Sequence, residues 1–242
     1  MVLRKGDVLD RVRPPCLSVV IPTLNEAGSI VGALRALRAA PVPVEVIVAD
    51  GGSTDGTRDL ARPLADRVVA AAPGRARQLS AGVAAARGDV LVLLHVDTRL
   101  PEGGLARIHD HARPGAMVWG RFDVRLEGRS ALLPVVAALM NLRSRWTGIA
   151  TGDQTIFVTR SAWDRVGGLP DIPIMEDIAL SRRLCRIARP VCLRARATTS
   201  GRRWDANGPL RTIGVMWIMR LGYAAGVSPA RLARLYGRLR RG

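Results

Sequence analysis

The chain has few cysteines, and that shortage removes two classes of protein. Its 242 residues include three cysteines, Cys16, Cys185 and Cys192. They lie far apart or in apolar runs, so they provide neither a disulfide framework nor the spacing of metal ligands. We therefore expect a protein of the reducing cytoplasm. The charged first fifteen residues lack an apolar core, so we expect no secretory signal there.

Long apolar runs are also missing. No segment reaches the roughly 18 apolar residues that a membrane-spanning helix needs. The run from Ala131 to Leu142 is too short, and Arg220 interrupts the run from Leu210 to Val227. We therefore expect no more than peripheral contact, with the inner face of a membrane.

Positive charge is abundant but uneven. The formal net charge is +17, and the stretch from Arg182 to Gly242 holds fifteen arginines and one acid, Asp205. Lys5 is the sole lysine. Codon bias in a GC-rich genome would explain this preference for arginine as well as a need for bidentate contacts with a ligand would. We expect no nucleic-acid partner, because aromatic residues do not interleave the basic tail as stacking platforms. A basic module that binds membrane surfaces remains an alternative.

Three short apolar runs predict parallel strands, namely Leu17 to Ile21, Val44 to Ala49 and Val90 to Leu94. Each is rich in Val, Leu and Ile without alternation, which is typical of strands buried on both faces. Apolar residues at helical spacing follow two turns and predict two helices. The first helix begins after Asn25, its expected cap, and the second begins after Gly74. The order is therefore βαβαβ, and the sequence predicts an α/β fold in one domain.

The pattern changes beyond Pro114. Alternation from Val118 to Leu126 favours an antiparallel or edge strand. We then expect a helix at about 131–146, a strand near 155–159, a helix from about 176 to 188 and a strand near 191–196. Two helices end the chain, the second capped by Ser228 with Pro229 in its first turn.

Polar loops follow the predicted strands, where ligands bind in an open parallel α/β sheet. Asp50 and Asp55 could accept the hydroxyl and ring N–H hydrogens of a nucleoside, although helix capping is the alternative. The second acid in one loop favours a ligand. Arg75 and Arg77 begin a helix and could bind a diphosphate. Neither a P-loop ending nor a dinucleotide fingerprint is present, which removes the usual basis for an ATPase or a dehydrogenase.

Two further groups of residues suggest chemistry. Asp97 could place a hard oxygen ligand for Mg²⁺ or Mn²⁺ at the rim, with His95 on the same face, although both could simply cap a helix. Glu176 and Asp177 open an amphipathic helix. They could complement its dipole, worth ~0.3–1 kcal/mol, or one could act as a general base.

Five segments in this order resemble the family 2 glycosyltransferases of the GT-A fold. They are LSVVIPTLNEAGSI, VIVADGGSTDGT, GRARQLSAG, LVLLHVDT and GDQTIFVTRSAWDRVGGLPDIPIMEDIALSRRL. The resemblance implies a Rossmann-like, mostly parallel sheet flanked by helices, with a helical basic C-terminal tail. Within a single domain, residues 14–112 would bind the nucleotide sugar, residues 113–200 would form the acceptor and catalytic half, and residues 201–242 would form the tail.

The resemblance also implies an activity and roles for residues. The activity is an inverting transfer from a nucleoside-diphosphate sugar, with UDP as the default, to a small-molecule or lipid-linked acceptor. Asp177, with Glu176 beside it, looks like the catalytic base, and Asp97 and His95 would hold Mn²⁺ or Mg²⁺. The implied donor-site residues are Pro22, Thr23, Asn25, Glu26, Asp50, Gly52, Asp55, Arg75, Arg77, Gln78, Asp153, Gln154, Arg202, Arg203 and Trp204.

The chain departs from the family pattern at one motif. His95-Val96-Asp97 stands where the family usually has Asp-x-Asp, as in a small bacterial subgroup that also has the stretch from Gly152 to Gln154. Arg202-Arg203-Trp204 resembles an element of processive members, whose membrane spans are missing here, so a single transfer is expected. The acceptor and the oligomeric state stay open, and a GT-A-like nucleotidyltransferase remains an alternative.

Overall fold

The computed structural model describes residues 16–113 and 115–241, so residues 1–15, where we expect no secretory signal, lie outside it. The described chain forms one eight-stranded sheet in the order β3-β2-β1-β4-β7-β6-β8-β5. The strands are β1 (Leu17–Thr23), β2 (Val44–Asp50), β3 (Arg67–Ala70), β4 (Val90–Leu93), β5 (Thr98–Arg99), β6 (Trp119–Glu127), β7 (Ile156–Thr159) and β8 (Val191–Ser200).

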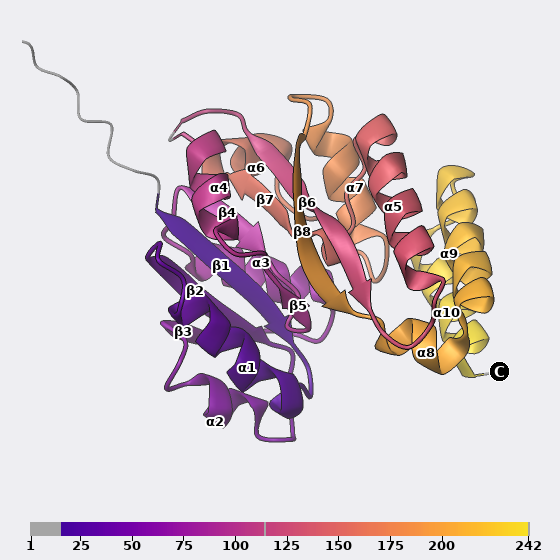
Figure 1. Ribbon diagram of the computed structural model, residues 1–242, viewed down its shortest axis with the longest axis horizontal. Coiled ribbons are helices and arrows are strands. Elements are labelled where there is room, and N and C mark those ends of the chain that lie inside the picture. The colour runs from indigo at the N-terminus through magenta and orange to yellow at the C-terminus, as the bar shows by residue number, and fades with distance from the viewer. Residues whose placement is uncertain (1–15, 114, 242) are drawn as a thin grey trace, which may run out of the picture.

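Helices cover both faces of this sheet (Figure 1). They are α1 (Ala27–Arg38), α2 (Thr57–Ala61), α3 (Arg75–Ala85), α4 (Gly104–His111), α5 (Leu133–Thr147), α6 (Arg160–Val166), α7 (Glu176–Leu184), α8 (Arg202–Asn207), α9 (Pro209–Ala224) and α10 (Pro229–Arg241), with a 3-10 turn η1 (Gly152–Gln154). Buried residues of α1, α2 and α4 join one core cluster, and those of α3, α6 and α7 join the cluster on the other face.

The first half of the sheet confirms the predicted parallel strands. β1 pairs in parallel with both β2 and β4, and β2 pairs in parallel with β3. Successive residues of β1 enter opposite cores: Val19 packs in the cluster of α1 and Val20 in the cluster of α3. Because both faces are covered, the strand sequence is apolar without alternation. The strand β3 at the sheet edge is an addition to the predicted order.

The second half of the sheet is mixed. β6 is antiparallel to β7, as its alternation predicts, but it also pairs in parallel with β8 and so lies inside the sheet rather than at an edge. The edges are β3 and β5. Alternation shows that the two faces of a strand differ in burial, but it does not show which strands pair with it. The pairing of β6 with β8 was therefore not predictable from the alternation alone.

The start of α1 corrects one prediction. Glu26 occupies the N-cap position, and Asn25, the expected cap, has a left-handed φ of 55°. The Asn25 side-chain oxygen accepts the backbone N–H of Thr54 at 2.9 Å instead. The N–H of Ala27 in the first turn of α1 is bound by Asp55, at 2.9 Å. A neighbouring loop therefore supplies the cap that the sequence assigned to Asn25.

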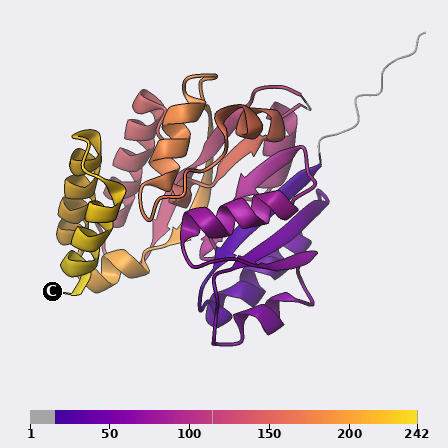
Figure 2. The same ribbon diagram turned by 180° about the vertical axis from the view of Figure 1, so that it is seen from behind.

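The end of the chain is helical, as predicted, with one more helix than expected. The short helix α8 precedes the predicted pair, and α10 begins at Pro229 directly after Ser228. Figures 1 and 2 both show α5 beside α9 and α10 at one end of the molecule. Within residues 16–113 and 115–241, no helix is long and apolar enough to cross a membrane.

Candidate functional site

The loop after β2 is shaped by Asp50. Its carboxylate is buried and accepts the N–H groups of Gly52 and Ser53, both at 3.0 Å, together with the Ser53 hydroxyl. The Thr23 hydroxyl donates at 3.3 Å. Burial alone would raise the pKa of Asp50, but the hydrogen bonds, led by Ser53, outweigh burial and hold the pKa below its usual value. Asp50 is therefore a charged group at the end of β2, next to the exposed Gly52.

Asp55 lies in the same loop and binds two helix starts. One carboxylate oxygen accepts the Ala27 N–H of α1, and the other accepts the Thr57 N–H of α2 at 3.0 Å. The Thr57 hydroxyl is the largest cause of the lowered pKa of Asp55. The capping role that the sequence left as an alternative is therefore present in the structure. Together with the Asn25–Thr54 bond, Asp55 fixes the end of β1, which holds Pro22, and the following loop, which holds Glu26, against the loop after β2.

Gln78 comes from α3 and connects two strand ends from beneath. Its side-chain amide donates to the carbonyl oxygens of Thr23 at 2.6 Å and Ala49 at 3.2 Å, and the residue is buried. A Cβ on Gly51 would lie 2.8 Å from the Gln78 nitrogen, so a larger residue there would displace this amide from the strand ends. Gln78, predicted to contact the donor, instead holds the ends of β1 and β2 together.

The two arginines at the start of α3 point to different partners. The Arg77 Nε donates to both carboxylate oxygens of Asp171, at 2.8 and 3.1 Å, and this bond raises the pKa of Arg77 further. The Arg75 guanidinium lies 3.7 Å from the Glu176 carboxylate. Arg75 therefore faces the candidate catalytic acids, whereas Arg77 connects α3 to the loop that precedes α7.

Residues from three distant segments meet around Gly152. His95, after β4, has its Nδ1 3.6 Å from the Asp153 carboxylate. The Gly152 N–H donates to the Asp177 carboxylate at 3.0 Å. A Cβ on Gly152 would lie 2.3 Å from Nε2 of His95, so the imidazole packs directly on this glycine. The geometry brings together His95, Asp153 and Asp177, three residues that sequence reasoning had named separately.

The charges of this cluster oppose one another. Burial would raise the pKa of Asp153, but His95 first, then Arg203 and Arg75, lower it to about 2. Burial, and then the neighbouring Asp177, raises the pKa of Glu176 to about 7. Burial also raises the pKa of Asp177. Asp153 thus stays ionised while the adjacent Glu176 keeps a proton up to about pH 7, a separation of pKa values that is typical of acid–base sites.

Glu176 and Asp177 differ in access. Glu176 is buried, and Asp177 is partly exposed. Besides Gly152, Asp177 accepts the N–H of Ile178 at 2.7 Å. Met175, at the N-cap of α7, has a left-handed φ of 70°. This turn aims the first residues of α7 at the Gly152 cluster, with Asp177 as the accessible carboxylate.

Asp97 lies on the other side of His95, at the end of the β4 loop. Its carboxylate is about 3.5 Å from Arg202, which also lies 3.8 Å from Glu26. Among the described residues, no three His, Cys, Asp or Glu side chains gather as a preformed metal cage. A carboxylate at an open rim fits Mg²⁺ or Mn²⁺ if phosphate oxygens complete the coordination. His95 fits less well as a ligand, because its Nδ1 faces Asp153.

Two predicted donor-site side chains point into the interior. Gln154 is fully buried, accepts the Thr151 N–H at 3.2 Å and donates to Asn141 at 3.3 Å. Trp204 packs against the apolar cluster formed by β6 and α5. Both therefore support the site from behind rather than line it.

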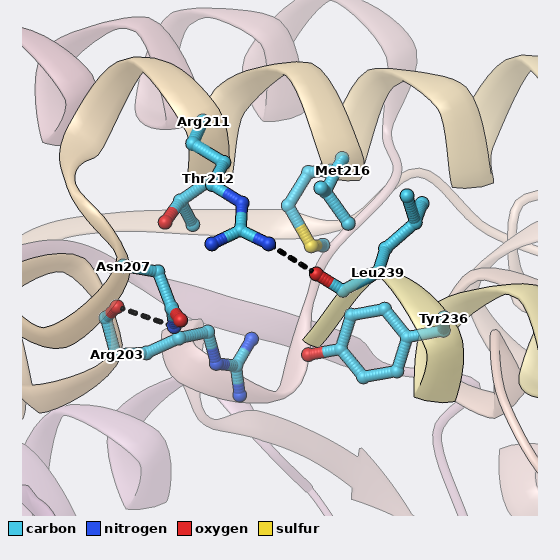
Figure 3. A pocket seen from close by; sticks show the side chains of 8 residues that line it. Arg203, Asn207, Arg211, Thr212, Met216, Tyr236 and Leu239 are labelled. Carbon is cyan, nitrogen blue, oxygen red and sulfur yellow. Dashed lines mark hydrogen bonds between the residues drawn. The ribbon is translucent and has the colours of Figure 1, made fainter. Parts of the chain in front are cut away.

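Arg203 connects the cluster to the C-terminal helices. It lines a cavity of about 20 Å³ between α8, α9 and α10. In Figure 3 the Arg211 guanidinium bonds the Leu239 carbonyl oxygen, at 2.8 Å, across this cavity. The volume suffices for about one water molecule, not for a sugar. A larger hollow of about 280 Å³ lies beside Arg160. The backbone N–H of Arg160 donates to the carbonyl oxygen of Asp89, which directly precedes β4. That hollow is therefore at the end of the sheet opposite Asp97.

Sequence reasoning missed two contributors to this site. Gly152 supplies the N–H bound by Asp177 and the flat surface under His95. Asp171 binds Arg77. The glycine next to Asp153 could have indicated this packing from the sequence, since glycine permits close approach of a side chain to the backbone. The pairing of Arg77 with Asp171 had no local signal, because the two residues are 94 positions apart.

The packing of His95 on Gly152 predicts the effect of a single methyl group. In Gly152→Ala, the new Cβ would displace the imidazole from Asp153, and a misplacement of about 1 Å costs up to ~10²-fold in rate. We expect at least a tenfold loss of turnover, together with a lower melting midpoint because the added methyl group overpacks the site. Gly28→Ala is the matched control, because a Cβ there meets nothing within 4 Å. Equal turnover in both variants would contradict this arrangement.

Comparison with known proteins places this site in a family context. Residues 18–160 match the sequence profile of Glycosyl transferase family 2. The undecaprenyl-phosphate 4-deoxy-4-formamido-L-arabinose transferase of Pseudomonas aeruginosa is 32% identical over 151 residues, 57% of this chain and 44% of the relative. The succinoglycan biosynthesis protein ExoA of Rhizobium meliloti is 53% identical over 49 residues, 19% of this chain and 15% of the relative. The chain thus spans less than half the length of these curated relatives.

Solved structures show the same fold. A mannosyltransferase from Pyrobaculum calidifontis, in complex with GDP-mannose and Mn²⁺, superposes with a TM-score of 0.63 at 21% identity, over 93% of this chain and 69% of that one. Glucosyl-3-phosphoglycerate synthase from Mycobacterium tuberculosis, with Mn²⁺, UDP and its product, gives a TM-score of 0.61 at 23% identity, over 88% of this chain and 81% of that one. The predicted GT-A architecture is confirmed.

Proposed function

We propose, since the chain belongs to glycosyl transferase family 2, that it transfers a sugar from a nucleoside-diphosphate sugar to a small-molecule or lipid-linked acceptor with inversion. The observation that carries this proposal is the Gly152 cluster. An accessible carboxylate with a raised pKa, Asp177, lies there beside arginine charge from two helices. Asp50 lies at the end of β2 and Asp97 in the loop after β4, two parallel strands that flank β1, and the nucleotide of such a donor binds at this edge in α/β sheets.

The comparisons support the donor class. The two superposed structures hold GDP-mannose in one case and UDP in the other, each with Mn²⁺. The curated relative from Pseudomonas aeruginosa acts, by its name, on undecaprenyl phosphate. The loop at Asp50 and Gly52 would let a flat nucleobase approach the backbone. We propose UDP as the nucleotide because it is the default donor of the family that the sequence resembles.

The proposed reaction begins at Asp177. Its carboxylate takes the proton of an acceptor hydroxyl while that oxygen forms a bond to the anomeric carbon. The bond from this carbon to the diphosphate breaks, and its electron pair leaves with the nucleoside diphosphate. The raised pKa of Asp177 makes it a stronger base than an exposed carboxylate. The neighbouring Glu176 is buried, and burial raises its pKa to about 7.

The charge that develops on the leaving group would be offset from two sides. Arg75 and Arg203, whose charges both act on Asp153, stand beside the cluster. A divalent ion held by Asp97 and the donor phosphates would add Lewis-acid stabilisation there. The single carboxylate of the His-x-Asp motif means that the arginines carry more of this task than in a site with two acids.

A product assay distinguishes this function from its nearest rival. Incubation with a panel of nucleotide sugars should release a nucleoside diphosphate, whereas a nucleotidyltransferase would release pyrophosphate from a nucleoside triphosphate. Pyrophosphate release without any nucleoside-diphosphate release would replace the proposed transfer by the rival reaction.

The protonation of Glu176 predicts how stability depends on pH. In the folded state burial raises the pKa of Glu176 to about 7, from the 4.5 that is usual for a glutamate, so the residue keeps its proton up to about pH 7. Between these values the folded state binds more protons than the unfolded state, so the free energy of unfolding should fall as pH rises and level off above 7. Glu176→Gln should remove most of this fall, the rest coming from Asp177, whose pKa is also raised, and should add on the order of 1–3 kcal/mol at about pH 8.

Urea denaturation at a series of pH values measures this effect. Glu102→Gln is the control, because Glu102 is exposed at the start of the α4 segment. The control should follow the wild-type curve. A wild-type stability that rises between pH 5 and 7 would show that Glu176 is ionised throughout in the folded protein.

We also propose a division of labour and a location. Residues 14–112 would bind the donor, residues 113–200 would bind the acceptor and supply the base, and residues 201–242 would form a basic tail. The enzyme would work in the cytoplasm, with this tail available to the inner face of the membrane. The charge of the tail, which has one acid among its 41 residues before Gly242, supports this location.

A further inference from the structure

Helix α5 presents an apolar stripe on the side away from the sheet. Its inner side packs on β6 through Leu133, Val136 and Ala137. The outer side carries exposed apolar residues at spacings of three and four, which place them on one face of a helix. They are Leu132, just before the helix, Val135, Leu139, Leu142 and Trp146. Trp146 is 82% exposed, so the largest apolar side chain of the stripe is also the most open.

Helix α9 presents a second stripe. It contacts the cluster beneath α5 through Ile213 and packs on α10 through Met219, which contacts Leu232. Its remaining side carries Leu210, Trp217, Ile218 and Leu221, all exposed, with Trp217 at 57%. Figures 1 and 2 show α5 and α9 side by side in both views. Two neighbouring helices thus each expose an apolar stripe that includes a tryptophan.

The charge around these stripes has one sign. The helices α5, α9 and α10 contain no acidic residue and nine arginines. Arg231, Arg234 and Arg238 of α10 are exposed next to α9. Apolar residues with interfacial tryptophan and a surround of arginine are the composition of a helix that lies in the headgroup region of a bilayer.

We infer that the α5–α9 face, defined by the two stripes, docks on the surface of an anionic lipid bilayer. The apolar stripes enter the boundary between headgroups and acyl chains, and the arginines meet lipid phosphates. A second copy of the chain is a weaker fit. A two-fold interface would bring the same arginine-rich helices together without acids to pair with them.

This docking has a consequence for the acceptor, which rests on the proposed sugar transfer. Helix α8 leads into α9 through Gly208, and its Arg202 and Arg203 act on Asp97 and Asp153. The catalytic rim therefore lies one short helix away from the docked face. An amphiphile anchored in the same bilayer, with its reacting group at the headgroup level, is the acceptor class that this placement fits.

Vesicle flotation of the full chain tests the docking. We expect it to float with vesicles of phosphatidylcholine that contain roughly one-third phosphatidylglycerol, and much less with phosphatidylcholine alone. The double variant Trp146→Ser, Trp217→Ser should lower the partition coefficient at least about tenfold, because it removes apolar area from the contact. Leu60→Ser is the control, since Leu60 is exposed on α2, far from α9 in Figure 1.

Each other outcome overturns the inference. The docking fails if the wild type does not float on the anionic vesicles, or if the double variant floats as well as the Leu60→Ser control. Light scattering that shows a wild-type dimer and a monomeric double variant would assign the face to a second copy. Nucleoside-diphosphate binding, measured in solution on the same samples, reports on the proposed function separately: a chain that binds nucleotide but does not float loses only the docking.

Discussion

The Asp177→Asn variant should lose turnover by about 10²–10⁴-fold, the usual contribution of a general base, while it binds nucleotide as the wild type does. Asparagine has the same shape and can still accept the Gly152 N–H, which Asp177 binds at 3.0 Å. It cannot take a proton from an acceptor hydroxyl. The variant thus separates chemistry from donor binding, and single-turnover release of nucleoside diphosphate is the measurement.

A matched carboxylate serves as the control for this variant. Asp110 is exposed on α4, and Asp110→Asn should keep turnover within about twofold of the wild type, as surface substitutions usually do. If Asp177→Asn also keeps its turnover, the base is another residue, and Glu176 is the next candidate because its pKa is raised to about 7. Glu176→Gln would then show the loss instead.

The Asp97→Asn variant should lose the part of donor affinity that depends on the metal. A divalent ion contributes several kcal/mol to holding and polarising a diphosphate, so we expect a loss of about 10²-fold in affinity with Mn²⁺ present. Without metal, the variant should bind at least as tightly as the wild type, because it lacks a carboxylate that repels the diphosphate. Calorimetric titration of the diphosphate with and without Mn²⁺ measures both differences.

Glu102→Gln is again the control, an exposed acid five residues beyond Asp97. Equal affinities of wild type and Asp97→Asn in Mn²⁺ would contradict the metal role of Asp97. In that case the diphosphate would be held by the arginines, and Arg202, 3.5 Å from Asp97, would be the residue to replace next.

The parallel strands were predictable because burial on both faces leaves a strong local pattern. The runs at Leu17, Val44 and Val90 became β1, β2 and β4, with ends within one or two residues of those predicted. Their order along the chain then implied a common rim for the loops that follow. β8 could not be placed in the same way, since it pairs in parallel with β6 in a half of the sheet where β6 and β7 are antiparallel, and no local pattern encodes that choice.

The direction of a side chain was the least predictable property of the site. Gln78, Gln154 and Trp204 occupy motif positions next to the rim, yet all three point inward. Gln78 bonds strand ends, Gln154 bonds Asn141 of α5, and Trp204 packs on an apolar cluster. Sequence spacing locates a residue along a helix or loop, whereas its direction depends on φ, ψ and the packing around it. Asn25 shows the same effect, because its left-handed φ turns its side chain from α1 to Thr54.

The electrostatic character of the site also required the structure. In the sequence, Glu176 and Asp177 are two acids in the first turn of a helix. Their favourable interaction with the helix dipole is enough to explain their presence there. Their raised pKa values come from burial, and the low pKa of Asp153 comes from His95 and two arginines on other elements. These effects arise where residues 95, 153 and 177 meet at Gly152, a junction that no local pattern encodes.

The most direct test of the account is whether the rim binds a nucleotide. Isothermal titration of the full chain with a panel of nucleoside diphosphates, in the presence and absence of Mn²⁺, makes that measurement. We predict saturable binding of at least one diphosphate, strengthened by Mn²⁺ and weakened by Asp97→Asn. No binding of any nucleoside diphosphate with Mn²⁺ present would contradict the assignment of the strand-end rim as a sugar-nucleotide site.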